Sequence, residues 1–182
     1  MLENFTINLP NRTLILVEFT NLRDQIGVWA NINFDVHLPE LGIAEEIGEL
    51  THAVLKREQK IRGEAARKTK TEIEDALGDA AIYMLHLAYI QKITPNFANE
   101  LVPLDKELPL LGALHRSAGV LILRLHHFDS PFPLVVEWAI LFSNLWNFAA
   151  LHNLNLLNLT KDVWAKVSKR NWRKYPHNGL TT

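Results

Sequence analysis

Two groups of acidic residues have a spacing that would bring carboxylates together on helices. The stretch EEIGE, residues 45–49, places three glutamates within five positions, and Asp75 and Asp79 follow further along the chain. On a helix, Glu46 and Glu49 are three residues apart and the two aspartates four apart, so each pair lies on one helix face. Both pairs border apolar positions that would enter a core, which is an unusual place for charge.

Carboxylates that converge in this way repel one another unless a cation joins them. At ~4 Å, each like-charge pair costs about 4 kcal/mol at an effective dielectric of about 20. The chain has no cysteine, and carboxylate oxygens favour hard cations, chiefly Mg²⁺ or Mn²⁺. Mg²⁺ usually binds one or two carboxylates together with the phosphates of a substrate. The acidic residues therefore favour a divalent-metal site that handles a phosphate compound. An acidic, solvated helix N-terminus is the alternative interpretation of the first group alone.

Basic residues are concentrated in two segments, one between the two acidic groups and one near the C-terminus. The first segment includes Lys56, Lys60 and Arg62, which could hold phosphates as hydrogen-bond donors. A second basic cluster includes Arg170 and Lys174. It could fold over the phosphates, whereas a solvated basic surface would have the same composition.

The stretch WANINF, residues 29–34, precedes the first acidic group. Trp29 and Phe34 offer aromatic rings and Asn31 offers an amide, which are the groups needed to stack on a base and read its edge. Core aromatics around a loop would give the same pattern, so both interpretations stay open.

Apolar residues at helical spacing predict the elements that must position these groups. We expect helices over about 12–32, 40–60, 71–92, 111–127, 132–153 and 160–174, with an irregular linker at 93–110 that contains three prolines. Two-residue alternation is not convincing anywhere. The predicted fold class is therefore all-α, a single helical-bundle domain over residues 1–182 with about five to six helices. Its acidic helix pair would span about 40–92, and a second pair plus a C-terminal helix about 111–174.

The two predicted helix pairs resemble each other. The stretches LGIAEEIGELTHAVLK, residues 41–56, and LGALHRSAGVLILRLH, residues 111–126, both begin with Leu-Gly and have a similar spacing of apolar residues. The similarity fits a degenerate internal duplication of a helix pair, and it also fits the ordinary likeness of any two bundle helices.

Composition limits the partners and the location that we expect. A net charge of −1 over 182 residues gives no general attraction to nucleic acid polymers or acidic membranes. The N-terminus lacks a signal-peptide pattern. The most apolar window, residues 132–151, contains Glu137, Asn144 and Asn147, which would be costly inside a bilayer. We therefore predict a cytoplasmic protein that binds no membrane.

The acidic motifs resemble those of the MazG-like and dimeric dUTPase superfamily of all-α nucleoside triphosphate pyrophosphohydrolases. That family carries E-E-x-x-E on one helix and E-x-x-D on the next. EEIGE matches the first motif in full, and DALGD, residues 75–79, followed by the apolar AAIYMLHLA, matches the second in part. Ala76 stands where the family has a glutamate, and Asp75 on the same face looks like its substitute. The resemblance covers residues 26–92.

This resemblance implies hydrolysis of a (deoxy)nucleoside triphosphate between its α- and β-phosphates, which gives a monophosphate and pyrophosphate. It implies Mg²⁺ as the cofactor, with Mn²⁺ able to substitute. By position, Glu46, Glu49 and Asp79 look like metal ligands with Asp75 as a fourth, and Glu45 is similar to the residue that activates the attacking water. The family builds its bundle from two subunits or from a fused duplication. A homodimer or higher homo-oligomer is therefore expected unless the second helix pair closes the bundle.

Two other classes of protein compete with this interpretation. Glu49 and His52 form an E-x-x-H motif like that of di-iron carboxylate bundles, but such bundles need two of these motifs, and Asp79 has no histidine three residues later. The second competitor is a non-catalytic helical interaction protein that keeps the acidic motif, an alternative that Ala76 leaves open.

Overall fold

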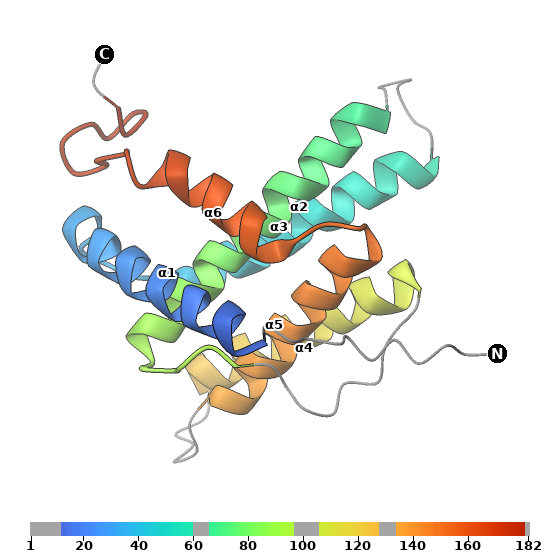
Figure 1. Cartoon of the computed structure of the whole chain (residues 1–182), viewed down its shortest axis with the longest axis horizontal. Coiled ribbons are helices and arrows are strands. Elements are labelled where there is room, and N and C mark those ends of the chain that lie inside the picture. The colour runs from blue at the N-terminus through green and yellow to red at the C-terminus, as the bar shows by residue number, and fades with distance from the viewer. Residues whose placement is uncertain (1–11, 60–65, 97–105, 128–133, 181–182) are drawn as a thin grey trace.

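The computed structural model describes residues 12–59, 66–96, 106–127 and 134–180. These ranges contain six helices and no strand, which confirms the predicted all-α bundle (Figure 1). The helices are α1 (Arg12–Asn33), α2 (Pro39–Gln59), α3 (Ala66–Ile90), α4 (Glu107–His127), α5 (Val135–Leu151) and α6 (Leu156–Val167).

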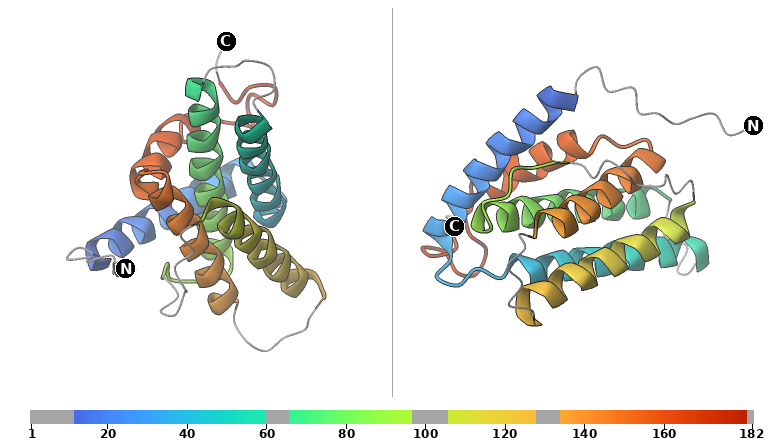
Figure 2. Two further views of the ribbon diagram at one scale, coloured as in Figure 1. Left: turned by 90° about the vertical axis from the view of Figure 1, so that its right-hand side faces the viewer. Right: turned by 90° about the horizontal axis from the view of Figure 1, so that it is seen from below.

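The six helices are arranged in three layers. α3 and α5 form the middle layer, which packs on α2 and α4 on one side and on α1 and α6 on the other (Figure 2). α2 and α3 form one helix pair, and α4 and α5 form another. The two pairs complete a four-helix bundle within one chain.

The helices of the middle layer, α3 and α5, are apolar on most sides because other helices pack on both faces of the layer. Much of α3 between Ile73 and Ala88 is buried, and so is most of α5. Trp138 of α5 stacks on Phe142 at 4.6 Å between ring centroids, and its indole N–H donates to the carbonyl of Met84 at 2.8 Å. The buried indole therefore has its polar atom satisfied, as a core tryptophan requires.

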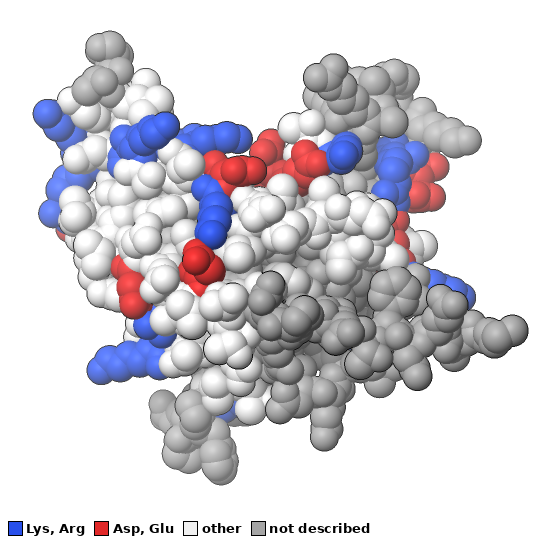
Figure 3. Space-filling model, in the orientation of Figure 1, with Lys and Arg blue, Asp and Glu red and all other residues white. Residues whose placement is uncertain are grey.

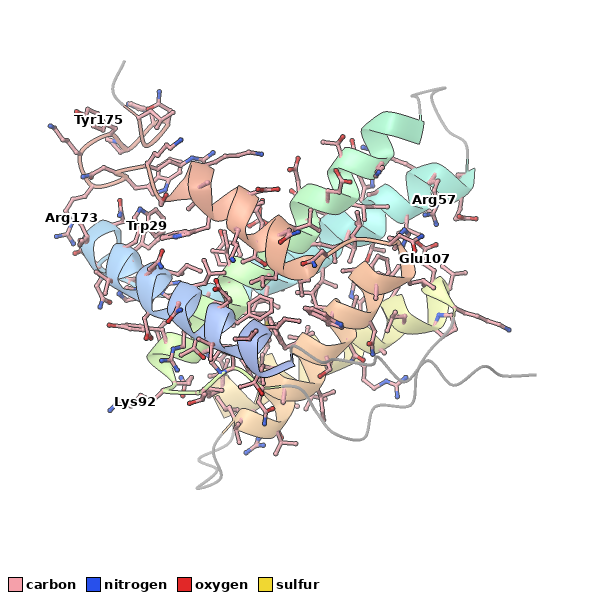
Figure 4. All side chains as sticks on the ribbon, viewed as in Figure 1. Trp29, Arg57, Lys92, Glu107, Arg173 and Tyr175 are labelled. Carbon is pink, nitrogen blue, oxygen red and sulfur yellow. The ribbon has the colours of Figure 1, made fainter. Side chains whose placement is uncertain are left out.

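Polar contacts fix α2 and α4 in an antiparallel register. Figure 4 shows Arg57 at the end of α2 close to Glu107 at the start of α4, and these two residues form an ion pair. His152 at the end of α5 also reaches Glu107, with 2.6 Å between His152 Nε2 and Glu107 Oε1. Three contacts set the register along the helices: Glu40 with His126, Thr51 with His115, and Arg57 with Glu107.

Several helix ends differ from the predicted ones. α4 begins at Glu107, inside the predicted linker, because Pro109 lies in its first turn, where a missing N–H costs nothing. α6 ends at Val167, and residues 168–180 fold as turns instead of the predicted helix. Within these turns the Asn171 N–H donates to the carbonyl of Gly179 at 2.6 Å. Gly179 has a φ of 73°, which glycine adopts readily.

One helix of the described ranges, α4, is long and apolar enough to cross a membrane by length and composition. Its window Glu107–His126 has a mean hydropathy of 1.3 and is 33% buried. The apolar window noted in the sequence, residues 132–151, corresponds to α5, which lies in the middle layer. Its Asn144 is buried and donates to Ser117 Oγ at 3.2 Å, so this polar side chain bridges two helices.

Candidate functional site

The hairpin of α2 and α3 brings the two acidic groups to the same height. Near one end, the ring of Tyr83 lies so close to Gly42 that an added Cβ would be 2.5 Å from it. Near the other end, Lys56 Nζ is 3.2 Å from Glu72 Oε1. Between these two contacts, residues 45–49 run alongside residues 75–79. An ordinary antiparallel hairpin is therefore enough to make the acidic groups meet.

Glu46 is the centre of this acidic cluster. Burial raises its pKa from 4.5 to about 8, and the carboxylates of Asp79, Glu49, Glu45 and Asp75 add to the shift in that order. The five acidic residues singled out in the sequence therefore act on one another in the fold. A half-buried carboxyl with a pKa this high is one that is costly to ionise without a cation.

Asp79 is the second perturbed carboxyl of the cluster. Burial raises its pKa, and so do Asp75 and Glu49, whereas the positive charges of Arg170 and Lys166 oppose the rise. Asp79 therefore lies where the acidic cluster faces basic residues of the C-terminal part of the chain.

The donor set fits a hard divalent cation, since it consists of carboxylates with no thiolate. Glu45, Glu49 and Asp75 are exposed, so their neighbours do not lock their rotamers. In the side-chain positions of the described ranges, no three His, Asp or Glu residues are grouped closely enough to hold a metal ion. Metal binding would thus require these exposed side chains to turn toward Glu46.

A pocket of about 480 Å³ opens beside the acidic cluster on the α2–α3 hairpin. Lys56, one of the predicted phosphate-binding residues, lies on its wall. The lining residues are Glu45, Gly48, Glu49, His52, Lys56, Glu72 and Asp75.

Lysine and arginine side chains of α6 and the segment after it form a basic wall near Asp79, outside the lining of this pocket. Figure 3 shows acidic side chains along the floor of a hollow, with basic side chains above α6 on one side of it. α6 comes this close because residue 78 is a glycine. A Cβ added there would be 2.5 Å from Val163 Cγ2 and 3.3 Å from the carbonyl oxygen of Leu159. Gly78 therefore positions the helix that carries Lys166 next to Asp79.

The segment that contains Arg170 is fastened to the end of α1. The indole N–H of Trp29 donates to the carbonyl of Arg170 at 3.0 Å, and the N–H of Trp172 donates to Asn33 Oδ1 at 2.7 Å. Arg173 forms an ion pair with Asp35, and Figure 4 shows Trp29 and Arg173 together where α1 meets this segment. These contacts hold Arg170 near Asp79.

The aromatic residues predicted for base stacking are packed against other rings. Trp29 makes edge-to-face contacts with Phe34 at 5.4 Å and with Trp164 at 5.8 Å between centroids. Both Trp29 and Phe34 are half-buried. In this structure Trp29 supports the C-terminal segment through its indole N–H, and Phe34 packs on Trp29.

The other predicted substrate-binding residues lie apart from the acidic cluster or outside the description. Asn31 is exposed on the last turn of α1. Lys174 is exposed, with its Nζ 5.3 Å from the ring of Tyr175. Lys60 and Arg62 lie outside the described residues.

Two residues at the site, Tyr83 and Glu72, were not assigned to it from the sequence, whereas Lys166 belongs to the C-terminal basic cluster that the sequence offered for the phosphates. Burial and the charges of Glu46, Glu45 and Asp79 raise the pKa of Tyr83, so its hydroxyl stays protonated beside the carboxylates. Helical spacing was the available signal for both, because Tyr83 is four residues after Asp79 and Glu72 is three before Asp75. Only the tertiary fold shows that Lys166 faces Asp79.

We expect Gly78→Ala to separate α6 from α3. The new Cβ would overlap Val163, and overpacking of this kind costs about 1–3 kcal/mol of unfolding free energy, more than the helix propensity that alanine gains. Urea unfolding would measure the loss. The double variant Gly78→Ala/Val163→Ala removes the overlapping atom and should show a favourable coupling energy. Strict additivity of the two changes would contradict this packing.

Comparison with protein-family models, with curated proteins and with solved structures finds no match to this chain.

Proposed function

We propose that this protein is a Mg²⁺-dependent nucleoside triphosphate pyrophosphohydrolase, in which Mn²⁺ can replace Mg²⁺. The observation that carries the proposal is the effect of four neighbouring carboxylates on half-buried Glu46, whose pKa is raised to about 8. Such a cluster is unfavourable without a cation, and its ligand type selects a hard one. The basic wall near Asp79 suits the phosphates that usually complete the coordination of Mg²⁺.

Each acidic residue has a role in this proposal. Glu46, Glu49 and Asp79 would hold the metal, with Asp75 as a further ligand in place of the glutamate that Ala76 replaces. When bound, Mg²⁺ supplies positive charge that offsets the charge developing on the phosphates.

Glu45 is exposed at the edge of the pocket and is left outside the ligand set. A free carboxylate there can accept the proton of the attacking water as the bond between the α- and β-phosphates breaks. Pyrophosphate then leaves with the bonding electron pair.

Basic residues on both sides of the cluster would bind the phosphates. Lys56 lines the pocket from α2, and its ion pair with Glu72 is half-exposed, so a phosphate can compete for it. Lys166 and Arg170 approach from α6 and the segment after it. Trp29, Phe34 and Asn31 lie at the end of α1 beside this wall and would border the base.

The second helix pair closes the bundle within one chain, as a duplicated pair would. We therefore infer that one chain holds one complete acidic cluster. The nucleotide is the proposed partner, with no nucleic acid polymer and no membrane, and the proposed location is the cytoplasm.

The test is direct incubation of the purified protein with Mg²⁺ and each common NTP and dNTP. Equal amounts of pyrophosphate and the corresponding monophosphate are the expected products. Absence of product at high protein concentration, with either Mg²⁺ or Mn²⁺, would contradict the proposal and favour a helical interaction protein. Stoichiometric iron in the purified protein would instead favour a di-iron carboxylate bundle, although α3 has no histidine three residues after Asp79.

A further inference from the structure

The E-x-x-H motif of α2 contains one residue, His52, that the proposed reaction leaves without a role. His52 is exposed and lines the pocket beside the acidic cluster, one turn before Lys56 on the same helix. Among the described residues it has no hydrogen-bond or ion-pair partner. A di-iron centre would need a second histidine, and α3 has none three residues after Asp79. The ring of His52 is therefore free to bind a group that enters the pocket.

The charge of the pocket wall changes along α2. Glu49 lies in its acidic part, whereas His52 and Lys56 lie about 4.5 Å and about 10 Å further along the helix axis. Lys56 is paired with Glu72 at 3.2 Å, and both side chains are 30% exposed, so this ion pair is weak and can open. This part of the pocket thus offers two N–H donors to an anionic group that extends away from the metal ligands.

A second group of cations lies at the other end of the acidic cluster. Lys166 and Arg170 act on Asp79, which is one helical turn further from the pocket than Asp75, and neither cation lines the pocket. Arg170 is fastened to the indole of Trp29, so the aromatic residues suited to a nucleoside lie on this side. The lining of the pocket has no tryptophan, tyrosine or phenylalanine. The two ends of the cluster therefore suit different parts of a nucleotide.

We propose that His52 and Lys56 bind the pyrophosphate that leaves, while the nucleoside monophosphate stays on the side of Arg170. This inference rests on the proposed hydrolysis and fixes the direction in which the substrate crosses the metal. When the water oxygen bonds to the α-phosphorus, the bridging oxygen leaves with the β-phosphate and its electron pair. His52 can donate a ring N–H to this group in either protonation state, because neutral imidazole keeps one N–H. Lys56 adds a positive charge.

Pyrophosphate should enter this pocket only together with a divalent cation. The lining holds one lysine against four carboxylates: Glu45, Glu49, Glu72 and Asp75. Without a cation such a lining repels an anion, so the metal must offset the carboxylates before His52 and Lys56 can hold pyrophosphate. This requirement distinguishes the pocket from an ordinary basic patch, which would bind pyrophosphate without metal.

Calorimetric titration of the full chain with inorganic pyrophosphate tests the assignment, because binding of a product needs no turnover. Binding is expected with Mg²⁺ and is not expected with EDTA. His52→Ala should weaken it about tenfold, the effect of losing one hydrogen bond to a charged group, and Lys56→Ala at least as much. His52→Gln should recover most of the affinity, since its amide also donates N–H.

The matched control is His177→Ala, which removes an exposed histidine of the C-terminal turns and should leave pyrophosphate affinity unchanged. Circular dichroism should show the same helix content in all variants, because His52 is exposed and Lys56 is partly exposed. The affinity for Mg²⁺ alone should not change in His52→Ala, since this residue is not a metal ligand in the proposal. Arg170→Ala should weaken AMP, CMP, GMP and UMP more than it weakens pyrophosphate.

Four results would each overturn the inference. They are an unchanged pyrophosphate affinity in His52→Ala, a loss of Mg²⁺ affinity in that variant, pyrophosphate binding without metal, and a larger effect of Arg170→Ala than of His52→Ala on pyrophosphate. The hydrolysis itself can fail separately. A chain that binds Mg²⁺ and pyrophosphate through His52 but releases no product from any nucleotide would contradict the proposed function and leave the pyrophosphate site standing.

Discussion

Glu49→Gln is expected to abolish Mg²⁺ binding and reduce kcat/KM by about 10³-fold or more, the scale seen when a preorganised charge at a reacting phosphate is lost. The amide keeps the shape of the side chain but cannot supply the negative charge that a hard cation requires. Pyrophosphate release would report turnover, and titration calorimetry with Mg²⁺ and Mn²⁺ would report binding.

The fold should survive this substitution. Glu49 is exposed, and its charge contributes to the raised pKa of Glu46, so its removal relieves repulsion in the metal-free protein. We therefore expect no loss in thermal stability without metal. Glu58→Gln is the matched control, because Glu58 is an exposed glutamate near the end of the same helix and should keep full activity. Turnover that persists in Glu49→Gln would show that the chemistry lies elsewhere.

Metal-free protein is expected to lose stability as the pH rises from about 6.5 to 8. The pKa of Glu46 is about 8 in the fold, whereas its ordinary value, which applies to the unfolded chain, is 4.5. In this interval the folded state holds a proton that the unfolded state has already released, so the free energy of unfolding falls with pH. The loss should be about 1 kcal/mol, because a half-exposed carboxyl is partly screened by water.

The pH interval of 6.5 to 8 matters because His86 changes the free energy of unfolding in the opposite direction at lower pH. Burial and the neighbouring His37 lower its pKa from 6.5 to about 4, so stability rises with pH between those values. Above about 6.5 this contribution is complete, and Glu46 dominates. Guanidinium unfolding at several pH values would give the profile, and Glu46→Gln should flatten it between pH 6.5 and 8. Saturating Mg²⁺ should also remove the loss at pH 8, since it binds the ionised carboxylates of the folded state. A profile that Glu46→Gln does not change would contradict the assignment.

Local spacing was sufficient to predict each acidic pair but not that the two pairs meet. The pairs Glu46–Glu49 and Asp75–Asp79 depend on helical periodicity alone. Their meeting depends on the register of α2 against α3, which spacing left open and which the contacts of Gly42 with Tyr83 and of Lys56 with Glu72 show. The helical fold class follows from the same periodicity. Helix ends were predicted less well, because Pro109 can open a helix as well as interrupt one.

The basic half of the site depends on contacts that the sequence does not contain. Trp29 and Arg170 are 141 residues apart and meet through one hydrogen bond, so spacing carries no signal for it. Gly48 and Gly78 look alike as helical glycines. The structure separates them, because Gly78 lies against Val163 and Gly48 faces open space.

The acidic residues and the segment with Arg170 are held by different helices, so substitutions could alter one without the other. The acidic floor belongs to the α2–α3 hairpin, whereas the segment with Arg170 is held by Trp29, Asn33 and Asp35 at the end of α1. In the proposed enzyme, metal affinity and phosphate affinity would thus be separable traits of two structural units. Exchanging residues 168–180 should retune which anions enter the hollow while the cation site keeps its ligands, which makes this segment the natural target for redesign of specificity.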